Sequence, residues 1–114
     1  AAVITASALL LSAPVAVATP ASQASAVRSA QTYIEIQGFS RQGLINQLEY
    51  EGYSTADASA AVDSLGIDYN EQAARSAETY LEIQGFSYKG MVEQLAYEGY
   101  TASQAAYGAS SVGL

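Results

Sequence analysis

From about residue 24 onward, apolar residues recur every three or four positions, the spacing of one face of an α-helix. No stretch alternates between apolar and polar residues for long enough to indicate a strand, so the pattern predicts an all-α fold. The first three helices are expected over about 24–37, 40–51 and 54–65. The expected inward residues are Val27, Ala30, Tyr33 and Ile34; Leu44, Ile45 and Leu48; and Ala58, Ala61, Val62 and Leu65.

The expected helix ends carry residues that are typical of caps. Gly38 is expected to end the first helix, as a glycine after a helix C-terminus commonly does. Ser40 is placed to cap the second helix, with Phe39 before it and Leu44 after it as a hydrophobic staple. A hydroxyl or carboxylate residue followed three positions later by an acidic residue or Gln predicts capping boxes at later helices. These pairs are Ser54 with Asp57, Asp68 with Glu71, and Thr101 with Gln104.

The chain contains an ungapped internal repeat. Residues 28–30 (Arg-Ser-Ala) recur as 75–77, a period of 47 (75 − 28), and the match continues through 35–40 and 50–53. A long repeat without gaps indicates a duplicated structural unit. We therefore predict two tandem three-helix helix-turn-helix repeats with a period of 47, over residues 26–67 and 68–114.

The first 18 residues carry no charge and end in Ala16-Val17-Ala18, the small-x-small pattern at which signal peptidase cuts. We interpret 1–18 as a signal peptide that lacks its basic beginning, and 19–25 as a linker. A buried N-terminal helix is one alternative. A membrane-spanning helix is another, although Pro14 and several hydroxyl residues weaken it. The first interpretation predicts an exported protein, secreted or held at the cell surface.

Composition narrows the possible functions. The chain has no Cys and no His, so it lacks disulfides, thiolate metal ligands and the commonest general base. No phosphate-binding, dinucleotide or nucleophile-elbow motif is present, and no carboxylates have the spacing of a calcium loop. We therefore expect no catalytic residues, no cofactor and no metal. Four basic residues against eleven acidic ones give a net charge of −7, which disfavours nucleic acid and favours a cationic protein partner.

Two Glu-Gly turns, one in each repeat, are the candidate partner-binding sites. Each turn is bracketed by tyrosines, which offer a large contact area at a low entropic cost. The acidic residues could steer a basic partner, or could simply form a solvated surface. The tyrosines could instead pack the turn between helices two and three. The partner-binding and the packing interpretations of the tyrosines both stay open. The candidate residues are Tyr50, Glu51, Tyr53, Tyr97, Glu98 and Tyr100.

The repeated pattern resembles the Ltp-like surface-exposed lipoproteins, helix-turn-helix repeat proteins of Gram-positive bacteria and their temperate phages. The resemblance covers about residues 26–114. In the first copy it rests on Ala30, Tyr33, Ile34, Phe39-Ser40, Gly43-Leu44-Ile45, Gln47-Leu48 and Glu51-Gly52-Tyr53-Ser54, all of which have counterparts 47 residues later.

This resemblance implies a role in superinfection exclusion. Phage-encoded members lie on the outer face of the host membrane and block DNA injection by contacting an injection component such as a tail protein. A lipoprotein needs a cysteine after its signal, and this chain has none, so a secreted or wall-retained form fits better. The alternative function is that of an envelope structural protein that binds cell wall or further copies of itself.

Overall fold

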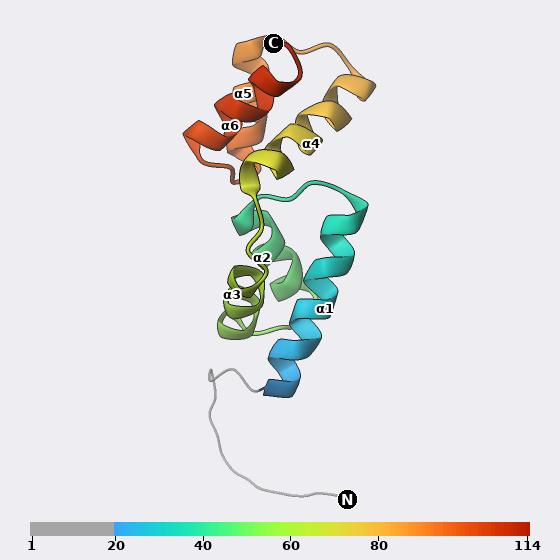
Figure 1. Cartoon of the computed structure of the whole chain (residues 1–114), viewed down its shortest axis with the longest axis vertical. Coiled ribbons are helices and arrows are strands. Elements are labelled where there is room, and N and C mark those ends of the chain that lie inside the picture. Colours follow the sequence, from blue (N-terminus) through green and yellow to red (C-terminus); the bar gives the residue numbers. More distant parts are fainter. Residues whose placement is uncertain (1–19) are drawn as a thin grey trace, which may run out of the picture.

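The computed structural model describes residues 20–114 as six α-helices (Figure 1). No strand occurs within these residues, which confirms the all-α prediction. The interpretation of 1–18 as a signal peptide concerns residues outside the described part. The helices are α1 (Pro20–Ile36), α2 (Arg41–Tyr50), α3 (Thr55–Ser64), α4 (Tyr69–Ile83), α5 (Tyr88–Tyr97) and α6 (Ala102–Ser111).

The start of α1 differs from the sequence-based expectation. Residues 20–25, predicted as part of a linker, are helical. Pro20 at the first helical position suits a helix start, because proline has no N–H to leave unpaired there. Tertiary contacts hold this turn in place, since Ser22 donates a hydrogen bond to the Asp57 carboxylate and the Ser25 Oγ lies 2.7 Å from the Tyr53 hydroxyl oxygen. These contacts are made with α3 and with the turn before it. The polar sequence of residues 20–25 alone therefore predicted a linker and not a helix.

Each repeat builds its own core from three helices. In repeat 1, α1 and α2 both pack against α3; in repeat 2, α4 and α5 both pack against α6. Alanines dominate both cores and allow the helices to approach closely. The fully or nearly fully buried apolar residues are Ala26, Ala30, Leu44, Ile45, Leu48, Ala58, Ala61 and Val62 in repeat 1, and Ala73, Ala77, Met91, Leu95, Tyr100, Ala105 and Ala109 in repeat 2.

Most of the predicted caps form. The Ser40 and Ser87 hydroxyls accept hydrogen bonds from the backbone N–H groups of Gly43 and Gly90, each at 2.9 Å. Thr101 makes the full capping box that was expected in α6.

The capping box predicted in α3 is only half formed. Ser54 accepts from the backbone N–H of Asp57 at 3.0 Å. The Asp57 carboxylate accepts instead from Ser22 of α1, so a contact between helices replaces the local one.

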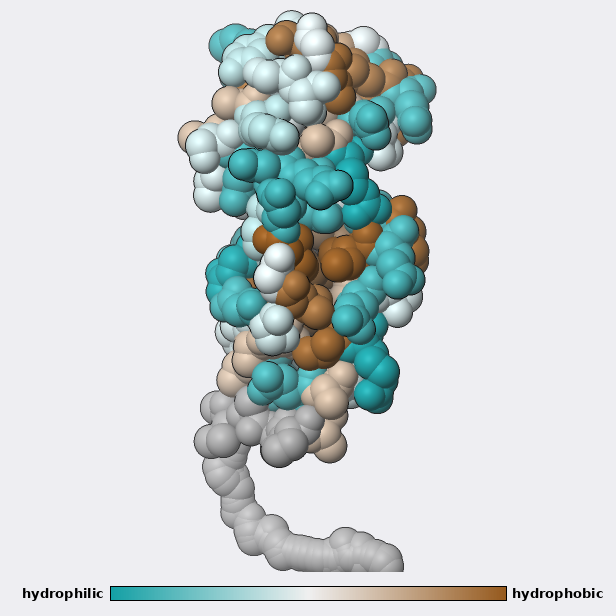
Figure 2. Space-filling view, viewed as in Figure 1, coloured by the Kyte–Doolittle hydropathy of each residue, from teal (hydrophilic) through white to brown (hydrophobic). Residues whose placement is uncertain are grey.

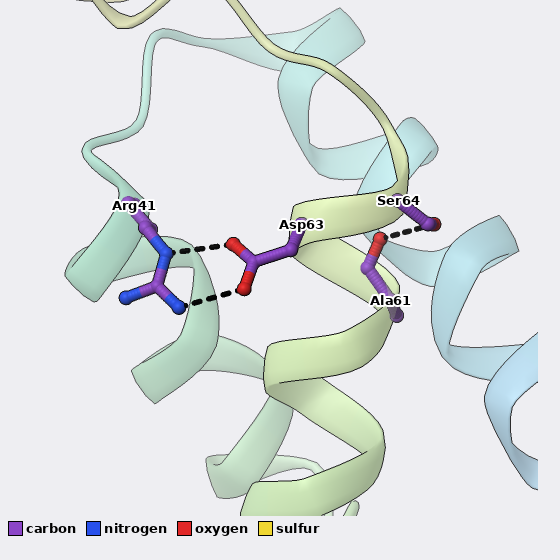
Figure 3. A network of polar contacts seen from close by, with 4 residues as sticks. All are labelled: Arg41, Ala61, Asp63 and Ser64. Carbon is purple, nitrogen blue, oxygen red and sulfur yellow. Dashed lines mark hydrogen bonds and ion pairs between the residues drawn. The ribbon is translucent and has the colours of Figure 1, made fainter.

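A bidentate ion pair joins α2 to α3 in repeat 1 (Figure 3). The Arg41 guanidinium donates to both carboxylate oxygens of Asp63, at 2.7 and 2.9 Å. The Arg41 side chain holds the pKa of Asp63 below its usual value. The corresponding positions of repeat 2 are Tyr88 and Ser110, so the pair distinguishes the two copies.

The two repeats stack end to end (Figure 1) in a body that measures 57 × 22 × 21 Å. The chain passes from α3 to α4 at Gly66, whose φ of +60° suits a glycine. Within residues 20–114, none of the helices has the length and apolar character needed to cross a membrane.

Candidate functional site: the Glu-Gly turns and the junction between repeats

The six predicted partner-binding residues fall into different environments. Tyr50 and Tyr97, at the ends of α2 and α5, are each 87% exposed. Glu51 is also exposed. These three side chains are available to a protein partner in the described part of the chain.

Tyr53 and Tyr100 point inward instead. The Tyr53 hydroxyl oxygen lies 2.7 Å from the Ser25 Oγ and 3.1 Å from the Ser29 Oγ. Tyr100 is 4% exposed, and its hydroxyl oxygen lies 2.8 Å from the Ser76 Oγ. Burial raises the pKa of Tyr100 to about 12. The packing interpretation of the tyrosines therefore describes this pair.

Glu98 differs from its repeat counterpart because it lies where the two repeats meet. Its backbone carbonyl accepts a hydrogen bond from the Ser40 hydroxyl of repeat 1 at 2.6 Å. Its side chain is half-buried, and burial raises the pKa of its carboxyl group. The six predicted residues therefore do not form one continuous surface.

Three hydrogen bonds cross the junction between the repeats. Besides the Ser40–Glu98 bond, the backbone N–H of Phe39 donates to the Gln72 side-chain carbonyl at 3.0 Å, and the Arg75 guanidinium donates to the Ile34 carbonyl at 2.6 Å. Repeat 1 contributes the end of α1 and the loop that follows it. Repeat 2 contributes one face of α4 and the turn after α5.

Two glycines permit this close approach. A Cβ at Gly38 would lie 2.5 Å from the Gln72 backbone carbonyl oxygen, and one at Gly99 would lie 2.8 Å from the Ser40 Oγ. Gly99 also has a φ of +104° and ends α5 as expected of a capping glycine. Gly38 does not have a positive φ, so the expectation that it caps α1 is wrong. Its small size matters instead, because α4 of the other repeat packs against it.

A cleft of about 160 Å³ opens at the junction. Hydroxyl groups, an aromatic ring and one carboxylate meet there. Its lining residues are Gln37, Gly38, Ser76, Thr79, Tyr80 and Glu98.

Among the residues that line the cleft, only Glu98 was predicted from the sequence as a partner-binding residue. The repeat carries no signal that could have found the others, because every one of them has an identical residue 47 positions away that lies elsewhere.

The junction brings polar side chains together with one half-buried acidic residue. Within residues 20–114, no three acidic side chains come together as a possible metal site. Figure 2 shows hydrophilic residues gathered across the visible face where the repeats meet, beside an apolar strip along repeat 1. A polar rim beside a partly buried carboxylate suits recognition of a charged group.

Comparisons with known proteins agree with this architecture. A family model described as host cell surface-exposed lipoprotein matches residues 21–65 and 68–112, one match for each repeat. Among solved structures, the chain is similar to Ltp, a superinfection exclusion protein from the Streptococcus thermophilus temperate phage TP-J34. The two share 29% sequence identity at a TM-score of 0.75, over 82% of this chain and 97% of that one. No curated protein sequence matches the chain.

Proposed function

This chain belongs to the family of host cell surface-exposed lipoproteins, and from that premise we propose that it is a non-catalytic, exported module that blocks phage DNA injection by binding a protein. The observation that carries the proposal is the similarity to the superinfection exclusion protein Ltp over nearly all of that chain. Because the similarity includes both repeats, it concerns the whole tandem unit and not one helix-turn-helix copy.

The charge of the chain indicates what kind of protein it binds. A net charge of −7 attracts a cationic partner and speeds its approach at low salt. The exposed Tyr50 and Tyr97 side chains, with Glu51 beside the first, offer aromatic contact area next to negative charge. A phage injection component with a basic segment fits this surface.

An infection assay tests the proposal. The chain is displayed on the outer surface of a susceptible Gram-positive host, and phage adsorption and entry of phage DNA are measured separately. We expect normal adsorption with reduced DNA entry. A Tyr50→Ala/Tyr97→Ala double variant should weaken protection without unfolding the chain, because both side chains lie almost wholly in solvent.

Two outcomes would contradict the proposal. Unimpaired DNA entry in cells that display the folded chain would remove the exclusion role. Retention of the chain on isolated cell wall, without any effect on infection, would favour the envelope-structural alternative.

A further inference from the structure

The cleft at the junction exists only because the two repeats stack. Each of its six lining residues has an identical counterpart 47 positions away, but the cleft requires Gln37 and Gly38 of repeat 1 to lie beside residues of repeat 2. A Cβ at Gly85, the counterpart of Gly38, would have no neighbour within 4 Å, so nothing in the described chain packs there as α4 packs against Gly38. The pairs are Gln37 and Gln84, Gly38 and Gly85, Ser76 and Ser29, Thr79 and Thr32, Tyr80 and Tyr33, and Glu98 and Glu51.

Glu98 is the charged residue that lines the cleft, and within residues 20–114 it forms no ion pair. The ion pairs in that part of the chain join Arg41 to Asp63 and Lys89 to Glu93. Burial is the cause of its raised pKa, with no contribution from a neighbouring positive charge. A carboxylate that loses water without gaining a cation lowers the stability of the fold. Residues that reduce stability are common where function requires them.

The surroundings of Glu98 are held in place. Ser40 fixes its backbone through the 2.6 Å hydrogen bond to its carbonyl. The Tyr80 ring packs edge-on against Phe86, with ring centroids 5.6 Å apart, and its hydroxyl accepts a hydrogen bond from the Gln94 side chain at 3.1 Å. The cleft therefore combines an acidic residue on a fixed backbone with a fixed aromatic wall.

We propose that the junction cleft binds one lysine or arginine side chain of the partner protein, with the Glu98 carboxylate as its counter-ion. The Tyr80 and Thr79 side chains would pack against the methylene stem, as apolar surface commonly does for long basic side chains. This inference rests on the proposed protein-binding function and names the chemistry of the contact. An anionic group would be repelled by Glu98, and a divalent metal ion would lack further acidic ligands among the described residues.

The repeat supplies a matched control for the test. Glu98→Gln and Glu51→Gln remove the same charge from identical turns, but only Glu98 lines the cleft. The probe is hexalysine acetylated at its N-terminus only, so that its six side chains stay charged. It is titrated into the full chain at low salt, and binding is followed by the shifts of the backbone amide NMR signals. We expect Glu98→Gln to weaken binding about tenfold and Glu51→Gln less than twofold. The shifts should concentrate at Gly38 and Thr79 and be small at their counterparts, Gly85 and Thr32.

A second measurement separates binding from misfolding. Because the half-buried Glu98 side chain forms no ion pair, Glu98→Gln should unfold at the same temperature as the wild type or a higher one at pH 7. Equal losses of affinity in the two variants, or shifts spread evenly over both repeats, would overturn the inference.

The infection assay and the hexalysine titration test the exclusion role and the cleft separately. If the chain gives no protection but hexalysine binds at the cleft, the exclusion role is wrong and the cleft stands. If the wild type and Glu98→Gln protect equally and hexalysine does not shift Gly38, the cleft is wrong and the exclusion role stands.

Discussion

At the scale of single residues, the two repeats give identical side chains different environments. Tyr53 and Tyr100 both pair with a serine on the first helix of their repeat. Tyr100 is buried, whereas Tyr53 is only half-buried. Gly38 of repeat 1 lies against the Ser76 hydroxyl that is paired with Tyr100. No such contact is seen within residues 20–114 for the serine partners of Tyr53.

This difference predicts unequal costs for removing the two hydroxyls. Tyr100→Phe leaves the Ser76 hydroxyl buried without this partner, which should lower the free energy of unfolding by about 1–2 kcal/mol. Tyr53→Phe should cost less than about 1 kcal/mol, because water can replace the hydroxyl near the more exposed Ser25 and Ser29. Urea denaturation of both variants checks the prediction, and equal losses would contradict it.

The raised pKa of Glu98 makes a second prediction about pH. The folded state binds the Glu98 proton more readily than the unfolded state does, so this residue favours unfolding above its folded-state pKa and ceases to do so as the pH falls through that value. Glu98→Gln should therefore stabilise the chain at pH 7, because the partly desolvated charge is removed. The gain should shrink on acidification. Thermal unfolding between pH 7 and pH 4 measures it, and a gain that is unchanged at low pH would contradict it.

At the scale of helices, local capping explains where most of the elements begin. Ser40 and Ser87 cap the corresponding helices α2 and α5 in the same way. Only Ser40 has a second role, since its hydroxyl also donates to the Glu98 carbonyl across the junction.

Comparing the two capping serines measures how much the Ser40–Glu98 hydrogen bond contributes to the free energy of unfolding. Ser87→Ala should lower the free energy of unfolding by about 1 kcal/mol, the usual cost of losing an N-cap. Ser40→Ala should cost about 1 kcal/mol more, because the partly buried Glu98 carbonyl also loses its donor. Chemical denaturation of both variants measures the difference. Equal costs would mean that the Ser40–Glu98 bond contributes nothing to stability.

At the scale of the whole molecule, the stacking of the repeats decides the shape of the binding surface. Gly38 permits the contact, and Gly85 is the same residue at the same place in the other repeat, without a neighbour. Because neither glycine has a positive φ, an alanine can adopt the backbone conformation of both.

The two glycines therefore predict opposite results for one substitution. Gly38→Ala should disrupt the junction at a cost of about 1–3 kcal/mol, because the new Cβ overlaps the Gln72 carbonyl. Gly85→Ala should be neutral or stabilising by up to about 1 kcal/mol. Small-angle X-ray scattering and residual dipolar couplings should show altered repeat orientation in Gly38→Ala alone. An unchanged orientation in both variants would mean that Gly38 does not control the stacking.

The sequence by itself determined the helices, the repeat and the charge. Periodic apolar positions and capping residues act over a few neighbouring residues, so they predicted α2 and α3 closely and the Thr101 capping box of α6 correctly. The repeat predicted two equivalent units, and the family follows from residues in both copies. The beginning of α1 was missed because its first turn depends on contacts with distant Asp57 and Tyr53.

Only the tertiary structure decided which copy of each repeated residue has a special role. Gln37, Thr79 and Glu98 are identical to their counterparts in sequence, yet the stacking of the repeats brings these three to one cleft. The end of α1 and the loop after it pack against α4 and the turn after α5 of repeat 2. Because no third repeat packs in the same way on repeat 2 within the described chain, the two copies are not equivalent. That contact joins residues far apart in the sequence, since Ser40 and Glu98 are 58 positions apart.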